Sequence, residues 1–223
     1  MQRAPLLLGL LGPSLALFLA ACAGGDSAEE RDGDLRGLAV ATFAGGCFWC
    51  VEADFERVPG VVEAVSGYTG GQVPDPTYRQ VSSGTTGHRE AVQVHFDPEK
   101  IGYDGLLQAF WRMVDPTDAG GQFSDRGREY TTAIWYHDEG QRAAAEASKA
   151  ALAASGRYPD AVVTPILPAT RFYEAEGYHQ DYAARNPVRY RYYRYFSGRD
   201  QYLERTWGEE LDLDIDRLGA GVD

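Results

Sequence analysis

Residues 45–52 read Gly-Gly-Cys-Phe-Trp-Cys-Val-Glu and mark the junction of two predicted elements. The apolar run at 38–44 before them is typical of a strand, and two glycines allow a sharp turn. Apolar residues then recur at helical spacing as far as Phe55, so we predict a helix. Cys47 falls in its first turn, where unpaired N–H groups and the helix dipole favour a thiolate. The stretch therefore predicts a nucleophilic cysteine at a strand-to-helix turn.

The composition limits the classes of protein to which this chain can belong. A length of 223 residues allows one sizeable domain or at most two small ones. The net charge of −12 argues against nucleic-acid binding, which needs a basic face. Nothing in the sequence demands a second subunit, so we expect a monomer.

The N-terminal segment has the features of an export signal. Arg3 is followed by an apolar run, 6–20, that is short for a membrane span and is broken by Gly12-Pro13. Leu19-Ala20-Ala21-Cys22 resembles the lipobox of bacterial lipoproteins, in which the cysteine is lipidated. We expect a signal peptide at 1–21 and a lipidated Cys22 with a flexible tether at 22–37. The protein would then be exported and membrane-anchored through its lipid, on the periplasmic or cell-surface side. The alternative is an ordinary secretory signal that happens to end in cysteine.

Periodicity and turn residues divide the remainder of the chain into alternating strands and helices. We predict strands at 61–68, 90–96, 132–136 and 162–167, and helices at 104–114, 138–155, 178–185 and 200–207. Two long polar loops, 70–88 and 115–130, separate them. This order indicates an α/β or α+β domain over 38–208, with helices packed on a mixed sheet. Residues 209–223 are expected to form an acidic, mobile tail.

Glu90 begins the most regular of these strands. Val92, Val94 and Phe96 share one face at period two, and Glu90 has the same parity. If that face meets the core, Glu90 points inward and burial raises its pKa. The alternative is an exposed glutamate at a fraying strand end, and parity alone does not decide between them.

The cysteine stretch closely resembles the signature of the peptide-methionine (S)-S-oxide reductases, or methionine sulfoxide reductases of type A. The similarity extends over residues 38–207 as an ordered series of further motifs. These are Ser66-Gly67-Tyr68-Thr69-Gly70-Gly71, Tyr78, Thr86-Gly87-His88-Arg89-Glu90-Ala91, Phe96-Asp97-Pro98, Asp115-Pro116-Thr117, Asp125-Arg126-Gly127, Tyr130 and 174–182. The resemblance implies the two-layer, ferredoxin-like α+β fold of that family.

The resemblance also implies a mechanism. The Cys47 thiolate attacks the sulfoxide sulfur, methionine leaves and the oxygen remains on Cys47 as a sulfenic acid. Glu90 matches the acid that protonates the oxygen. The remaining matches are Tyr78 and Tyr130, which hydrogen-bond the oxygen, Phe48 and Trp49, which hold the S-methyl group, and Asp125, a polar residue near the pocket.

Many members of this family resolve the sulfenic acid with a cysteine in a C-terminal tail, but this chain has no cysteine after Cys50. It resembles the branch with a second cysteine in the signature, so we expect Cys50 to form a disulfide with Cys47. A thioredoxin-like reductant would recycle it. The alternative is that Cys50 is a packed residue and an external thiol resolves directly. No metal or organic cofactor is implied.

Two other functions are compatible with parts of this sequence. Cys-x-x-Cys at a helix start is also typical of thiol–disulfide oxidoreductases, although these need neither the tyrosine-bearing loops nor an inward glutamate. A lipoprotein binding module with a structural disulfide is the non-enzymatic alternative. We predict the reductase, acting on methionine S-sulfoxide in oxidised exported proteins and on the free amino acid.

Overall fold

A computed structural model describes residues 37–212 of the chain. The predicted signal peptide, Cys22 with nearly all of its tether, and the tail beyond 212 lie outside the described residues. Within them, a six-stranded sheet has the order β7-β6-β1-β3-β2-β8. Its strands are β1 (Ala39–Ala44), β2 (Val61–Thr69), β3 (Arg89–Phe96), β6 (Ala133–Tyr136), β7 (Ile166–Pro168) and β8 (Tyr173–Glu174).

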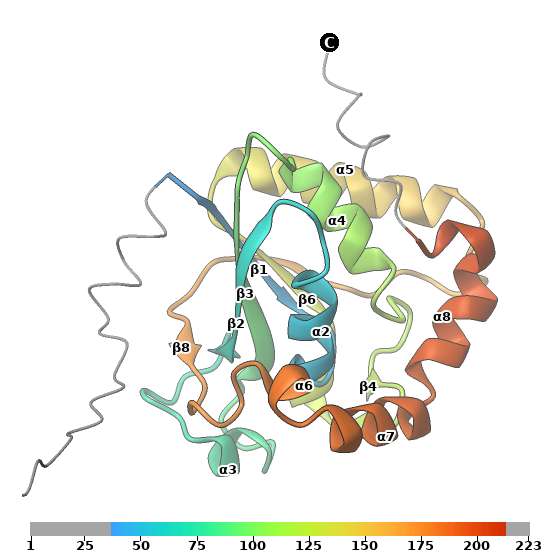
Figure 1. Ribbon diagram of the computed structural model, residues 1–223. Coiled ribbons are helices and arrows are strands. Elements are labelled where there is room, and N and C mark those ends of the chain that lie inside the picture. Colours follow the sequence, from blue (N-terminus) through green and yellow to red (C-terminus); the bar gives the residue numbers. More distant parts are fainter. Residues whose placement is uncertain (1–36, 213–223) are drawn as a thin grey trace, which may run out of the picture. The chain divides into compact units, whose positions relative to one another are not determined.

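The central four strands and two helices form a ferredoxin-like unit. The order is β1, α2 (Phe48–Phe55), β2, β3, α4 (Tyr103–Trp111) and β6. The pairs β1–β6, β1–β3 and β3–β2 are all antiparallel, so β1 and β2 enclose β3 in a split βαβ arrangement. Both helices lie on one face of the sheet (Figure 1). The α+β fold predicted above is thus confirmed.

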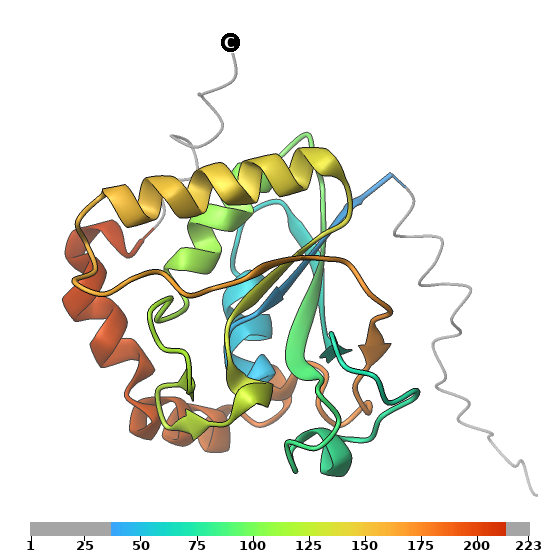
Figure 2. The same ribbon diagram turned by 180° about the vertical axis from the view of Figure 1, so that it is seen from behind.

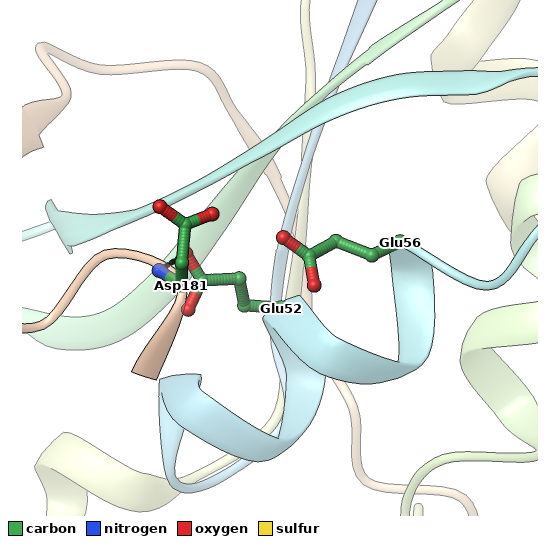
Figure 3. A group of neighbouring side chains, drawn as sticks. All are labelled: Glu52, Glu56 and Asp181. Atoms are coloured by element: carbon green, nitrogen blue, oxygen red, sulfur yellow. Dashed lines mark hydrogen bonds between the residues drawn. The ribbon is translucent and has the colours of Figure 1, made fainter. Parts of the chain in front are cut away.

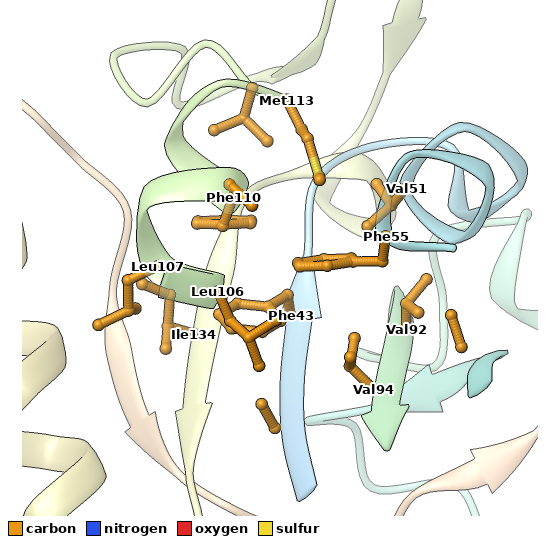
Figure 4. Packing of buried hydrophobic residues seen from close by; sticks show 14 of the residues in the cluster. Phe43, Val51, Phe55, Val92, Val94, Leu106, Leu107, Phe110, Met113 and Ile134 are labelled. Atoms are coloured by element: carbon orange, nitrogen blue, oxygen red, sulfur yellow. The ribbon is translucent and has the colours of Figure 1, made fainter. Parts of the chain in front are cut away.

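The core lies between these two helices and the sheet, where apolar side chains from both layers meet (Figure 4). Phe43 on β1 stacks on Phe55 of α2 and on Phe110 of α4, with ring centroids 5.0 Å apart in both pairs. Val92 and Val94 of β3 point into the same layer and are fully buried. Period-two strands and a period-3.6 helix thus bury one face each, and this burial fixes where α2 begins over the sheet.

The opposite face of the sheet is crossed by extended chain (Figure 2). After α5 (Glu139–Ala154) the chain forms β7, parallel to β6 at one edge, and then β8, beside β2 at the other. Between them Phe172 lies over Gly67, where an added Cβ would fall 2.3 Å from its ring. Pro165 directly precedes β7, so the observed strand is shorter than the predicted 162–167, and it lies at an edge of the sheet, where proline is tolerated.

Several elements differ from the sequence-based expectations. The loop at 70–88 contains α3 (Tyr78–Val81), and that at 115–130 contains β4 (Gly121–Gln122), β5 (Asp125–Arg126) and the 3₁₀ turn η1 (Arg128–Tyr130). The helix expected at 178–185 is only α6 (Tyr182–Arg185).

The C-terminal part of the described chain is helical and packed. The Arg- and Tyr-rich run forms α7 (Pro187–Ser197), and α8 (Arg199–Trp207) follows after Gly198. The expected tail begins with η2 (Gly208–Glu210), and Arg112 and Arg157 hold Glu210. Among residues 37–212, no helix is long and apolar enough to span a bilayer.

Candidate active site

The strand-to-helix turn places the two cysteines of the signature side by side. Cys47 is the N-cap of α2 and Cys50 lies in its first turn. Gly46 has φ +88°, and a Cβ there would fall 2.6 Å from the Cβ of Gln122, so only glycine allows this close approach. Both cysteines are free and buried, and their thiols are hydrogen-bonded to each other. Two sulfur atoms in this arrangement can form a disulfide with little movement.

The ionisation of Cys47 differs from the sequence-based expectation. Burial raises the pKa of its thiol well above the ordinary value, and Cys50 and Glu90 raise it further. Burial thus outweighs the helix dipole, and the N–H of Phe48, the first in the helix, donates to Glu90 Oε2 at 3.0 Å and not to the sulfur. Cys47 therefore rests as a thiol and must lose a proton before it can attack.

Cys50 is in the opposite electrostatic situation. The hydrogen bond from Cys47 and the positive charges of Arg199 and Arg194 lower its pKa. Arg199 is 1% exposed and donates to the carbonyl of Gly45 at 2.9 Å, and Arg194 is mostly buried against Asp54. Of the two thiols, Cys50 is therefore the one that ionises more readily.

Glu90 lies on the core face of β3 and is 2% exposed, so of the two orientations that strand parity left open the structure has the inward one. Burial raises its pKa to about 8, although the hydrogen bond from the Phe48 N–H opposes this shift. At neutral pH Glu90 is therefore a carboxylic acid that can donate a proton. It stands opposite Tyr68 in the register of β2 and β3, at the end of the strand nearest the cysteines.

Aromatic rings surround the cysteine turn. Trp49 stacks on Tyr182 with centroids 3.7 Å apart, and its Nε1 donates to His179 Nδ1 at 3.0 Å. Phe48 is 1% exposed and contacts His179 at 4.9 Å between centroids. Trp49, by contrast, is only half-buried. Phe48 therefore forms the floor of an aromatic cup and Trp49 one of its walls.

The two predicted tyrosines come from the two long loops. A capping box between Thr77 and Gln80 starts α3 at Tyr78, whose ring stacks 6.3 Å from that of Phe48. Tyr130 ends η1. Burial and then the Glu90 charge raise the pKa of both phenols, that of Tyr78 to about 12. Both remain neutral donors at physiological pH, and both interact electrostatically with Cys47.

Sequence reasoning missed the contribution of α7. The hydroxyl of Tyr193 donates to Asp125 Oδ2 at 2.5 Å and is hydrogen-bonded with Cys47. Tyr190, three residues earlier, packs against both cysteines. Pro187 at the start of this Arg- and Tyr-rich run and Gly198 after its end are the sequence signals that indicate a helix here. On that helix Tyr190 and Tyr193 share the buried side.

Glu52 of α2, Glu56 at the C-cap of that helix and Asp181 form an acidic cluster (Figure 3). Carboxylate oxygens of Glu52, Glu56 and Asp181 lie within 4.8 Å of one another, close enough to contact one cation. Burial raises the pKa of Glu52 to about 8, however, and its Oε1 accepts from the backbone N–H of Asp181. Asp181 is also paired with Arg185 at 3.2 Å. A neutral Glu52 and a paired Asp181 account for the cluster without a metal.

Comparison with known proteins shows which family this chain is similar to. The family described as Peptide methionine sulfoxide reductase matches residues 39–211. The peptide methionine sulfoxide reductase MsrA of Bacillus licheniformis is 53% identical over 185 residues, 83% of this chain and 98% of that protein. That of Bacillus subtilis is 55% identical over 169 residues, 76% and 96% of the two chains.

Solved structures show the same fold. Methionine sulfoxide reductase A of Corynebacterium diphtheriae superposes with a TM-score of 0.61 at 34% identity, over 69% of this chain and 77% of that one. The reduced form of Mxr1 from Saccharomyces cerevisiae superposes with a TM-score of 0.64 at 29% identity, over 68% and 87%.

Proposed function

The chain belongs to the peptide methionine sulfoxide reductase family, and we propose that it reduces the S epimer of methionine sulfoxide through Cys47 and Cys50. It is an oxidoreductase that converts a sulfoxide to a thioether. The observation that carries this assignment of roles is the buried carboxyl of Glu90 beside the Cys47 thiol. An acid that is neutral at physiological pH, next to a sulfur nucleophile, is what reduction of a sulfoxide by a thiol requires.

Substrate recognition divides between apolar and polar groups. The S-methyl group packs in the cup of Phe48 and Trp49, where contact between sulfur and aromatic rings is favourable. The oxygen is held by the hydroxyls of Tyr78 and Tyr130, which donate without carrying charge. With methyl and oxygen both fixed, only one configuration at sulfur directs its free face toward Cys47, so the cup selects one epimer.

In the first step the Cys47 thiolate attacks the sulfoxide sulfur while Glu90 protonates the oxygen. The attack forms a bond between Cys47 Sγ and the substrate sulfur. The protonated oxygen then moves from the substrate sulfur to Cys47 Sγ as this sulfur–sulfur bond breaks and its electron pair returns to the substrate sulfur, so methionine leaves and Cys47 is a sulfenic acid. Sulfur in the substrate is reduced by two electrons and Cys47 is oxidised by two. The place of Glu90 at the cysteine turn and its protonation at neutral pH support this step.

In the second step the Cys50 thiolate attacks Cys47 Sγ. The bond between Cys47 sulfur and the hydroxyl breaks, the hydroxyl takes one proton and leaves as water, and a Cys47–Cys50 disulfide remains. Support comes from the contact between the two sulfurs and from Arg194 and Arg199, which favour a thiolate at Cys50. No tail has to move to reach Cys47.

A thioredoxin-like protein would then reduce the disulfide. If the N-terminal segment acts as a lipoprotein signal, with Cys22 lipidated, this reductant must face the periplasm or the cell surface. The substrates are then methionine sulfoxide residues of exported proteins and free methionine sulfoxide. The enzyme would reduce them as a monomer that is anchored to the membrane by its lipid.

A single turnover tests these roles. Reduced full-length protein, freed of reductant, is mixed with each epimer of methionine sulfoxide; released methionine is counted and the protein is weighed by mass spectrometry. We expect methionine from the S epimer alone and a protein lighter by two hydrogens. Cys50→Ser is the control: it should release methionine equally well but gain one oxygen.

Three outcomes contradict parts of the proposal. A gain of oxygen by the wild-type protein would remove Cys50 from the resolving step. Equal release from both epimers would refute the selection by the cup. Reduction of insulin disulfides without sulfoxide, together with no methionine release, would favour the thiol–disulfide oxidoreductase.

A further inference from the structure

The resting protonation of Cys47 requires a route by which its proton leaves. Its thiol is buried at 5% exposure, so bulk water does not reach it freely. Glu90 is already protonated at neutral pH and acts as a donor, so it cannot also accept the thiol proton. A base that is connected to Sγ and is separate from the acid is therefore needed.

Helix α7 supplies this connection. The Tyr193 ring packs against the cluster that contains both cysteines and meets Trp49 edge-on, with centroids 6.0 Å apart. Its hydroxyl is hydrogen-bonded with Cys47 and donates to Asp125 Oδ2 at 2.5 Å. The Tyr193 hydroxyl thus lies between the reacting thiol and an acidic residue on β5: it donates to the Asp125 carboxylate, and the Cys47 S–H can donate to it by turning away from Cys50.

We propose that Tyr193 is a further catalytic residue, which passes the thiol proton of Cys47 to the carboxylate of Asp125. Two protons move: one from Cys47 Sγ to Tyr193 Oη, and one from Tyr193 Oη to Asp125 Oδ2. The S–H and O–H bonds break as an O–H bond forms at each acceptor, and no electrons are lost or gained. Tyr193 ends neutral and now donates to the thiolate, which it stabilises.

The surroundings of Asp125 make its carboxylate a suitable proton acceptor. Burial raises the pKa of its carboxyl, which makes it a stronger base than an exposed aspartate. It is partly exposed, so it can return the proton to solvent between turnovers.

The groups that surround the Cys47 sulfur are Cys50 on α2, Glu90 on β3, Tyr78 on α3, Tyr130 on η1, Tyr193 on α7 and, behind the turn, Arg199 on α8.

This inference rests on the proposed role of Cys47 as the nucleophile, and the test separates the two. The test uses the full-length protein, and the readout is the rate of methionine release in one turnover. If the wild-type protein releases no methionine, the proposed function fails. If it does, Tyr193→Phe, which keeps the ring against Trp49 but removes the hydroxyl, should be slower by about 10²-fold at pH 7. Tyr192→Phe is the matched control, since Tyr192 is 68% exposed on the same helix.

The pH profile distinguishes proton transfer from a packing defect. The ratio of wild-type to Tyr193→Phe rates should fall as pH rises, because hydroxide can replace the missing acceptor, whereas Glu90 loses its proton equally in both proteins. Asp125→Asn should give the same trend without altering α7. The double variant should be no slower than the slower single variant, since both changes interrupt the same proton transfer. A ratio independent of pH, or additive losses in the double variant, would overturn the proposal.

Cys50 is the competing acceptor, because its sulfur accepts the hydrogen bond of the Cys47 thiol and its pKa is lowered. The comparison is therefore repeated in the Cys50→Ala background, where only the first step is read. If Tyr193 carries the proton, Tyr193→Phe still slows methionine release there by a similar factor. If Tyr193→Phe releases methionine at the rate of its Cys50→Ala parent, the proton does not travel through Tyr193.

Discussion

Replacing Glu90 with Gln should stabilise the fold while removing the catalytic acid. Glu90 has a pKa of about 8 when folded and 4.5 as its ordinary value. Between these values the unfolded chain releases a proton that the folded protein keeps, so stability falls as pH rises. At about 1.36 kcal/mol per pKa unit, the destabilisation is about 1 kcal/mol at pH 5 and about 3 kcal/mol at pH 7. It becomes constant above pH 8.

The Gln side chain does not titrate, yet its carbonyl can still accept from the Phe48 N–H. Urea unfolding under reducing conditions should therefore show Glu90→Gln to be more stable than wild type, by a margin that grows from pH 5 to pH 8. Methionine release in one turnover should fall by about 10² or more. Glu99→Gln, at an exposed position, is the control and should change neither quantity. A stability difference that does not vary with pH would refute a neutral, buried Glu90.

Three further predictions follow from contacts described above. Tyr130→Phe removes one donor to the oxygen and should slow methionine release about tenfold, as stopped-flow single turnovers can measure. Arg194→Met should leave the first step unchanged but slow the second, so that dimedone traps more Cys47 sulfenic acid. Arg194→Lys keeps the positive charge and should restore resolution. Equal trapping in the wild type, Arg194→Met and Arg194→Lys would exclude the charge effect. Phe55→Ala should destabilise the core by about 3–5 kcal/mol in urea unfolding, whereas Phe196→Ala, at a 64% exposed position, should change stability by less than about 0.5 kcal/mol.

The features predicted most reliably from the sequence are those that follow from chain geometry. Strand alternation is fixed at two residues, so Val92 and Val94 in the core put Glu90 on the same face, although parity left open whether the strand end would be buried. The glycine pair before Cys47 similarly indicated a turn between β1 and α2. These inferences need only local conformation and one buried face.

Properties that depend on several distant segments were beyond the sequence pattern. The dipole argument for a Cys47 thiolate was sound for an isolated helix, but Glu90, 43 residues later, takes the N–H that the argument relied on. Tyr193 was not recognised because its role depends on Asp125 and Cys47, which only the folded chain brings to it. No spacing rule connects residues so far apart in sequence.

Trp49 stacks on Tyr182 beside the cysteine pair, so its fluorescence should report the redox state of the enzyme. Disulfides quench nearby indole fluorescence, and Trp111 and Trp135 are buried away from the cysteine cluster, in the two other apolar clusters. Closing the Cys47–Cys50 bond should therefore dim one indole of the protein selectively. In a triple variant with Trp111→Phe, Trp135→Phe and Trp207→Phe, Trp49 would be the remaining indole. Its fluorescence would then fall once and recover once in each catalytic cycle.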